Sequence, residues 1–200
     1  MSIAVKWPNF AKRISDQIRL VMKRIFLTGY MGSGKSTLGL RLAQKAGLSF
    51  IDLDHYIETR FRKTINEIFT EKGEDEFRLI ERNMLREIGE FEDIIIATGG
   101  GAPCFFDNID FMNKQGVCIY LKTSPEALFR RLKQARANRP LLREKSDTEL
   151  LEFIKENLAR RKEKYEQSSI IFDTGELDSY EEIDKAVNQL LEICKKSGTI

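Results

Sequence analysis

The stretch GYMGSGKST, residues 29–37, follows the apolar run Ile25-Phe26-Leu27 and precedes a helical pattern. Gly29, followed after four intervening residues by Gly34-Lys35-Ser36, matches the spacing G-x-x-x-x-G-K-[ST]. In loops of this pattern, backbone N–H groups surround phosphates, the lysine reaches the β- and γ-phosphates, and the hydroxyl binds Mg²⁺. The sequence therefore predicts a buried strand, a loop that binds a nucleoside triphosphate, and then a helix.

Each part of this loop has an expected role. Gly32 and Gly34 let the backbone wrap a phosphate without a Cβ clash. The helix that starts near Lys35 offers free N–H groups and the positive end of its dipole. A chance glycine-rich turn is the alternative, and the flanking strand and helix disfavour it. The residues expected to bind ATP or GTP with Mg²⁺ are Gly32, Ser33, Gly34, Lys35, Ser36 and Thr37.

Composition excludes several classes of protein. The 200 residues carry a net charge of +2, which is too balanced for a chain whose main partner is nucleic acid or an anionic membrane. Three distant cysteines form neither a C-x-x-C pair nor a disulfide framework, which favours a reducing cytoplasm. The lone His55 lacks the convergent partners that a metal site needs. We expect a cytoplasmic protein without nucleic-acid or membrane partners, acting as a monomer.

Short β-rich runs alternate with helical patterns along the chain, which predicts a parallel sheet with helices on both faces. The fold class is thus a three-layer α/β/α phosphate-loop fold with five strands. The expected strands are 24–28, 49–53, 93–98, 117–122 and 169–173, and the expected helices are 36–46, 73–91, 125–135, 147–167 and 180–195. Ser179 and Glu182 form an expected capping box.

Residues 1–21 stand outside this scheme, although Phe10, Ile14, Ile18 and Val21 have helical spacing. A membrane-surface or targeting helix is conceivable, but the charge is modest. We interpret residues 1–21 as an N-terminal extension and 22–200 as one phosphate-loop domain.

Two carboxylates, Asp52 and Asp54, come at the carboxyl end of the second expected strand, where open parallel sheets bind ligands. Strand alternation would turn both to one side and Leu53 to the other. One carboxylate would then serve the metal and one an acceptor hydroxyl. The competing interpretation is that they only cap the helix before Tyr56.

Three further motifs carry charge or glycine at informative places. Arg78 and Glu81 share a helix face, so that Glu81 would hold the guanidinium in place. The glycines 99–101 end an apolar strand and suggest a close approach of the backbone to a ligand. Arg139 precedes Pro140 in an expected loop at about 136–146, which suits a mobile lid that closes over transferring phosphates. A nucleic-acid patch at this loop would need interleaved aromatic residues.

The order of these motifs resembles the shikimate kinase family, from about Lys23 to the end of the chain. The family's phosphate loop corresponds to 29–37, its D-x-D to Asp52 and Asp54, its F-R to Phe77 and Arg78, its G-G-G to 99–101, and its R-P-L-L to 139–142. The match of Arg161 before Tyr165 is weaker, because the proline often found between them is absent.

The resemblance implies transfer of the γ-phosphoryl group of ATP to the 3-hydroxyl of shikimate in aromatic amino acid biosynthesis, with Mg²⁺ as cofactor. The implied catalytic residues are Lys35, Asp54 and Arg139, of which Arg139 would also reach ATP. Ser36 and Asp52 would serve the metal. The implied acceptor site consists of Asp54, Phe69, Phe77, Arg78, Glu81, Gly100 and Arg161.

Two alternatives remain open from the residues themselves. Another small-molecule kinase of the same fold, such as a gluconate-type enzyme, would need a different acceptor pocket. A nucleotide-gated binding protein without turnover would be expected to lose Lys35, Asp54 or Arg78, and all three are present.

Overall fold

The computed structural model describes residues 23–135, 142 and 145–200. Five strands form one sheet in the order β2-β3-β1-β4-β5, and all neighbouring strands are parallel. They are β1 (Arg24–Thr28), β2 (Ser49–Asp52), β3 (Ile94–Ala97), β4 (Val117–Lys122) and β5 (Ile170–Asp173). From the central β1, the chain goes first to β2 on one side and later to β4 on the other, and such a reversal creates a ligand-binding crevice beyond the carboxyl ends.

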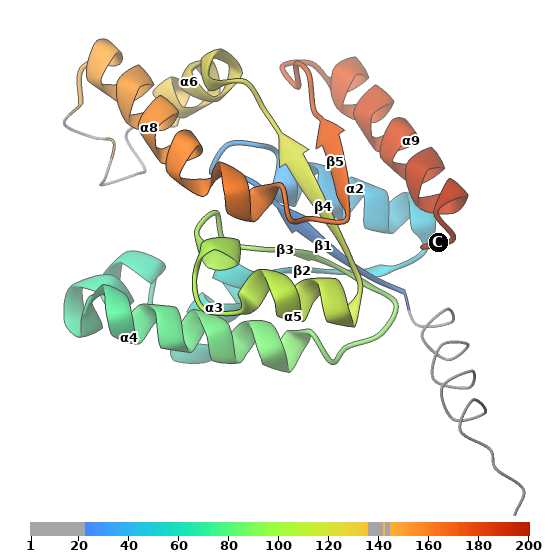
Figure 1. Ribbon diagram of the computed structural model, residues 1–200, viewed down its shortest axis with the longest axis horizontal. Helices are drawn as coiled ribbons and strands as arrows, with labels where there is room; N and C mark the ends of the chain where they lie inside the picture. Colours follow the sequence, from blue (N-terminus) through green and yellow to red (C-terminus); the bar gives the residue numbers. More distant parts are fainter. Residues whose placement is uncertain (1–22, 136–141, 143–144) are drawn as a thin grey trace, which may run out of the picture.

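Helices cover both faces of this sheet, which confirms the three-layer α/β/α fold (Figure 1). One face is covered by α2 and α9, and the other by α3, α4 and α5. Near the carboxyl end of β4, α6 and α8 pack on each other. The bounds are α2 (Lys35–Ala46), α3 (Leu53–Phe61), α4 (Ile65–Ile88), the 3₁₀ helix η1 (Ala102–Cys104), α5 (Asn108–Gln115), α6 (Pro125–Gln134), α8 (Asp147–Tyr165) and α9 (Tyr180–Lys196).

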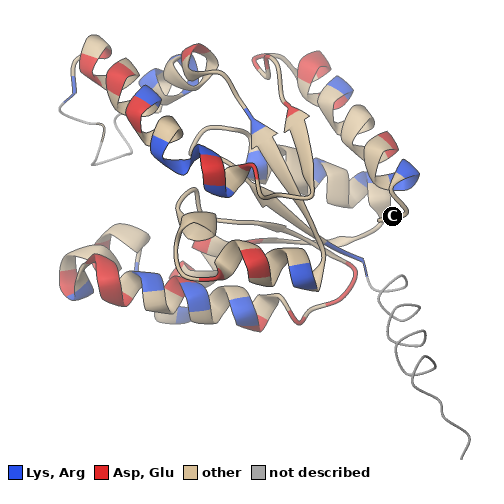
Figure 2. Cartoon of the chain, in the orientation of Figure 1, with Lys and Arg blue, Asp and Glu red and all other residues tan. Residues whose placement is uncertain are grey.

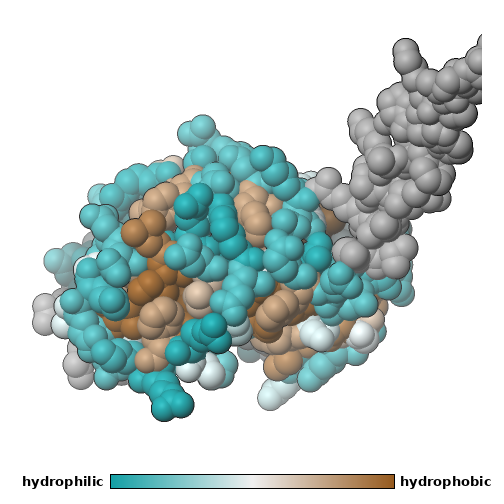
Figure 3. Space-filling view, turned by 90° about the horizontal axis from the view of Figure 1, so that it is seen from below, coloured by the Kyte–Doolittle hydropathy of each residue, from teal (hydrophilic) through white to brown (hydrophobic). Residues whose placement is uncertain are grey.

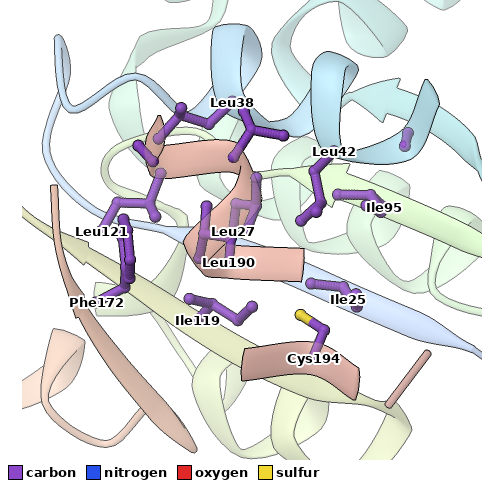
Figure 4. Close-up of a cluster of buried hydrophobic side chains, with 13 residues drawn as sticks. Ile25, Leu27, Leu38, Leu42, Ile95, Ile119, Leu121, Phe172, Leu190 and Cys194 are labelled. Carbon is purple, nitrogen blue, oxygen red and sulfur yellow. The ribbon is translucent and has the colours of Figure 1, made fainter. Parts of the chain in front are cut away.

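The central strands are apolar on both faces because both faces are buried. Ile25 and Leu27 of β1 point into the core under α2 and α9, which Figure 4 shows together with Leu38, Leu42 and Leu190. Phe26, between them, packs into the opposite core with residues of α3, α4 and α5. Because β1 lies between β3 and β4, the loop that follows Thr28 emerges at the centre of the sheet.

Charges of both signs alternate along the outer faces of α4 and α8 (Figure 2). Seen from the α4 side, the surface is mostly hydrophilic and is interrupted by hydrophobic patches (Figure 3). Leu79 of α4 and Phe106, between η1 and α5, are nearly half exposed. In the described part of the chain, no helix combines the length and apolarity needed to cross a membrane.

The five expected strands are all present, and the second ends one residue earlier than predicted. Asp52 accepts hydrogen bonds from the backbone N–H groups of Asp54 and His55 and so caps α3. Asp54 therefore lies in the first turn of α3 and not on a strand, and Leu53 is fully buried. The strand-alternation argument for this pair was thus wrong, although both carboxylates still reach one cavity.

The helix expected from residue 73 is the second half of a longer helix. Helix α4 extends from Ile65 to Ile88, but Gly73 has φ 79° and ψ 174°, so two helices meet there. The capping boxes at Thr64 and Ser179 are both formed, and the second was predicted. The helix α5 was not predicted, and α3 was expected only under the interpretation that the aspartates cap a helix.

Candidate active site

The phosphate loop lies between β1 and α2 and borders a cavity of about 310 Å³. Gly34 caps α2 with φ 92°, a conformation in which a side chain would be strained. Lys35 Nζ donates to the carbonyls of Gly29 (2.8 Å) and Tyr30 (3.0 Å), so the ammonium lies inside the curve of the loop. Thr37 also borders the cavity, and Ser33 is buried. The loop thus has the positive charge and open backbone expected of a phosphate site.

Two side-chain oxygens that could bind a metal ion lie close together beside this loop. Ser36 Oγ donates to Asp52 Oδ2 at 2.5 Å, while Asp52 Oδ1 caps α3. Asp52 therefore caps a helix, as the competing interpretation expects, and its other carboxylate oxygen faces the phosphate loop. Asp54 borders the same cavity.

The three glycines 99–101 make room for neighbouring protein groups. A Cβ on Gly99 would lie 2.8 Å from Asp54 Oδ1 and 2.6 Å from Glu81 Oε1, and one on Gly101 would lie 2.8 Å from Arg78 Nη1. A Cβ on Gly100 would lie 3.1 Å from the backbone nitrogen of Met31. The segment therefore brings Asp54, Glu81 and Arg78 together next to the phosphate loop.

Arg78 is held by two carboxylates of its own helix. Its Nη1 donates to Glu81 (2.8 Å), and Nη2 (3.0 Å) and Nε (3.3 Å) donate to Glu74. Glu81 is almost fully buried, and burial raises its pKa to about 7, an effect that Arg78 reduces and Asp54 increases. The predicted Arg78–Glu81 pair is formed, and it lies in the interior and not on a solvated face.

The two phenylalanines expected as walls lie together beside Arg78. Their ring centroids are 4.2 Å apart, and the guanidinium carbon of Arg78 lies 5.5 Å from the ring of Phe69 and 5.2 Å from that of Phe77. Phe77 is buried in the core under α4, whereas Phe69 is only partly buried.

Arg161 enters the same region from α8. Its Nη1 donates to the Gly100 carbonyl (3.3 Å), and the Tyr165 hydroxyl donates to the same oxygen (2.5 Å). The charge of Arg161 also lowers the pKa of Glu81 against the larger effect of burial. The helix after the expected lid thus supplies a second guanidinium near Glu81.

Five residues that border this cavity escaped the sequence analysis: Met31, Thr98, Arg131, Leu177 and Ile183. Arg131 of α6 donates to the carbonyls of Gly32 and Gly175 (both 3.2 Å). Arg131 lies in a strongly charged helix, so no sequence signal marked it. Arg139 and most of the segment 136–146 lie outside the described residues.

A larger hollow of about 1100 Å³ lies elsewhere, between β5 and α9. It is wide open, and none of the motif residues borders it. Among the described residues, no group of three His, Cys, Asp or Glu side chains could hold a metal ion by itself. The smaller cavity at the phosphate loop is therefore the candidate active site.

Comparison with known proteins agrees with this geometry. The sequence model of the family described as shikimate kinase matches residues 31–194. The chain belongs to the shikimate kinase family. The shikimate kinase of Bacteroides thetaiotaomicron is 52% identical over 172 residues, which are 86% of this chain and 98% of that protein. Membership confirms an ATP-dependent kinase and decides against a non-catalytic binding protein.

Two solved structures of shikimate kinases have the same fold. The crystal structure from Bacteroides thetaiotaomicron has a TM-score of 0.85 and 52% identity, covering 87% of this chain and 99% of that chain. The shikimate kinase from Acinetobacter baumannii in complex with shikimate has a TM-score of 0.75 and 32% identity, covering 90% and 97%. The phosphate-loop fold predicted from the sequence is thereby confirmed.

Proposed function

We propose that this member of the shikimate kinase family transfers the γ-phosphoryl group of ATP to the 3-hydroxyl of shikimate at the cavity beside the phosphate loop. The observation that supports this most is the meeting of Asp54, Glu81 and Arg78 at the glycines 99–101, with Arg161 on the Gly100 carbonyl. An anionic polyol needs carboxylates for its hydroxyls and guanidiniums for its carboxylate, and this region offers both.

On the donor side, backbone N–H groups of the loop would bind the phosphates of ATP, together with Ser33, Thr37 and the glycines. Lys35 would turn an N–H from a loop carbonyl to a phosphate oxygen, since an ammonium has three donors. Arg131 and Arg139 would add charge close to the nucleotide. These groups act by stabilising the negative charge of the transferring group.

Magnesium fits the donor set at Ser36 and Asp52. Mg²⁺ is usually bound through one or two carboxylates together with substrate phosphates, and these two oxygens lie 2.5 Å apart beside the loop. Ser36 would hold the ion directly, and Asp52 directly or through water. When bound, the ion neutralises charge on the β- and γ-phosphate oxygens.

On the acceptor side, Asp54 would orient the 3-hydroxyl and accept its proton, and the Gly100 backbone N–H would bind the acceptor. Arg78 and Arg161 would bind the acceptor carboxylate. Glu81 would hold Arg78, as it does here, and Phe69 and Phe77 would form the apolar wall. Alignment of the hydroxyl with the phosphate contributes most of the rate in such a reaction.

The experiment that tests this function offers ATP with a panel of acceptors, including shikimate, its methyl ester and gluconate. The ester keeps the ring and hydroxyl but loses the charge that both guanidiniums would meet. Hydrogen bonds to charged groups contribute about 1.5–3 kcal/mol each, so losing two should lower kcat/KM by roughly 10² to 10⁴. Equal kcat/KM for acid and ester would contradict the proposed carboxylate site.

We further propose that the protein acts in the cytoplasm as a monomer, without nucleic-acid or membrane partners. In support, the net charge is only +2, and charges of both signs mix on the helices (Figure 2). Sedimentation equilibrium with and without substrates tests the monomer, and a specific activity that changes with enzyme concentration would contradict it.

A further inference from the structure

Three arginines of α4, spaced four residues apart, each lie over an aromatic ring of the segment that follows β3. Residues at this spacing share one face of a helix. The distances from guanidinium carbon to ring centroid are 4.0 Å for Arg78 and Phe105, 5.2 Å for Arg82 and Phe106, and 4.5 Å for Arg86 and Phe111. Asp107 accepts hydrogen bonds from Arg82 (3.0 Å) and Arg86 (2.7 Å). This face of α4 is thus attached to the segment 105–111.

The contact of Arg78 with Phe105 is the closest of its aromatic contacts. It is 4.0 Å, against 5.5 Å for Phe69 and 5.2 Å for Phe77. A guanidinium stacked on a ring is attracted through its face, and its N–H groups stay in its own plane for carboxylates. The Phe105 ring therefore restrains the plane of Arg78 without using any of its donors.

Such a restraint matters because the partners of Arg78 are unequal. Glu81 is buried and accepts from one N–H, whereas Glu74 is mostly exposed and accepts from two. These bonds use three of the five donors of a guanidinium. An arriving carboxylate needs the remaining N–H donors of Arg78, or the two that now donate to Glu74, held in a fixed plane.

The segment that carries Phe105 is itself well anchored. The buried Asn108 side chain donates to the Ala102 carbonyl (2.9 Å), and the Asn108 backbone N–H donates to the Phe105 carbonyl (3.2 Å). Gly101, just before, allows Arg78 to approach the backbone. The turn η1 thus places the ring of Phe105 and the backbone of Gly101 against the same guanidinium.

We propose that Phe105 is a positioning residue for the acceptor carboxylate: its ring holds the plane of the Arg78 guanidinium in which the carboxylate binds. This rests on the proposed role of Arg78 in the acceptor site. Phe105 acts through Arg78, so its removal weakens acceptor binding and leaves the nucleotide side unaffected.

The test compares Phe105→Leu, which keeps apolar bulk without a ring, with Phe105→Tyr, which keeps the ring. Phe105→Leu is expected to raise KM for shikimate by about 3- to 30-fold, the range of a partly buried cation–π contact. KM for ATP and kcat stay nearly unchanged, and the preference for shikimate over its methyl ester shrinks. Phe105→Tyr keeps the KM for shikimate and the preference for shikimate over its methyl ester close to those of the unmodified protein. If Phe105→Leu is not folded, Phe105→Met makes the same comparison.

Phe106→Leu is the matched control, because Phe106 stacks on Arg82, is nearly half exposed, and belongs to no proposed binding group. It should leave the kinetic constants unchanged. An equal effect of Phe105→Leu and Phe106→Leu, or a fall in kcat without a change in KM for shikimate, overturns the proposal.

Arg78→Ala distinguishes failure of the proposed acceptor site from failure of the proposed role of Phe105. If Arg78→Ala leaves KM for shikimate unchanged, the proposed acceptor site itself is wrong. If Arg78→Ala raises KM for shikimate, the double variant with Phe105→Leu decides the second point. A KM for shikimate in the double variant above that of Arg78→Ala would mean that Phe105 does not act through Arg78. Equal KM values for shikimate in the double variant and in Arg78→Ala support the proposal.

Discussion

Burial of the charged carboxylate of Glu81 costs free energy, and its interactions with Arg78 and Arg161 offset only part of this cost. Its side chain is nearly inaccessible to water and close to Asp54, and Arg78 donates to it. Burial disfavours the charged form of a carboxyl group, and here it outweighs the nearby guanidinium. The residue therefore orients Arg78 at a cost in stability, as is common where charges are collected for binding.

This cost predicts how stability depends on pH. The pKa of Glu81 is raised from 4.5 to about 7, so between these values the unfolded chain has released a proton that the folded chain retains. The free energy of unfolding of the unmodified protein, relative to Glu81→Gln, should therefore fall as pH rises through this window. The total is at most about 3.5 kcal/mol, at about 1.4 kcal/mol per pKa unit. Urea titrations of both proteins at several pH values measure it, and parallel curves would contradict the prediction.

Asp54 is expected to matter for the chemical step. Asp54→Asn keeps the size of the side chain and removes its charge, so under the proposed function the acceptor hydroxyl would lose the group that positions it and takes its proton. We expect kcat to fall by about 10² or more, since such groups contribute about 10²- to 10⁴-fold. Steady-state kinetics with saturating ATP and shikimate measure it. A normal kcat with a raised KM for shikimate would mean that Asp54 only binds the acceptor.

Among the helices, α4 depends on a break at Gly73. The first part starts with the capping box of Thr64 and Glu67, and the second part carries Arg78 and Glu81. At φ 79° and ψ 174°, Gly73 has a backbone conformation that is essentially restricted to glycine. The break therefore sets the direction of the part of α4 that carries Arg78 and Glu81.

Gly73→Ala is expected to destabilise the fold. A Cβ there would meet nothing within 4 Å, so strain in the backbone is the only cost. We expect the free energy of unfolding to fall by about 1–3 kcal/mol. Chemical denaturation measures it. The control is Gly47→Ala, at the end of α2, where φ is 68° and ψ is 30°, a region that other residues enter more easily. An equal or smaller loss for Gly73→Ala would contradict this account.

In the whole molecule, the strands are parallel, so the phosphate loop after β1, Asp54 after β2 and the glycines 99–101 after β3 lie at the same edge of the sheet. The described chain is already part of this sheet at Lys23, whose carbonyl accepts from the Ile94 N–H (2.9 Å). The family match starts at residue 31. None of the residues with a proposed role precedes Gly29.

We therefore expect that deletion of residues 1–21 leaves kcat and both KM values nearly unchanged. The reason is that β1 and all site residues lie later in the chain. Kinetics of the shortened protein, with circular dichroism to confirm folding, provide the measurement. A large loss of kcat in a folded protein would show that these residues belong to the working domain.

The sequence by itself determined the strands, the phosphate loop and most long helices, because these depend on local patterns. Apolar runs such as Ile94-Ile95-Ile96 predict a buried strand wherever they occur, and the spacing of Gly34-Lys35-Ser36 needs no distant partner. The motif order also sufficed to predict the family that the comparisons confirmed. The helix α5 was missed, and α3 was expected only as the helix that the aspartates would cap, because helices of nine residues or fewer show little periodicity.

Only the tertiary structure decided which side chains meet. Asp54 and Glu81 are far apart in the sequence, yet both reach Gly99, because parallel strands align their carboxyl ends and α4 crosses beneath them. The contacts of Arg131 with Gly32, of Arg161 with Gly100 and of Arg78 with Phe105 likewise join distant segments. Local patterns carry no information on such pairs, because they arise only when the hydrophobic layers of the fold pack together.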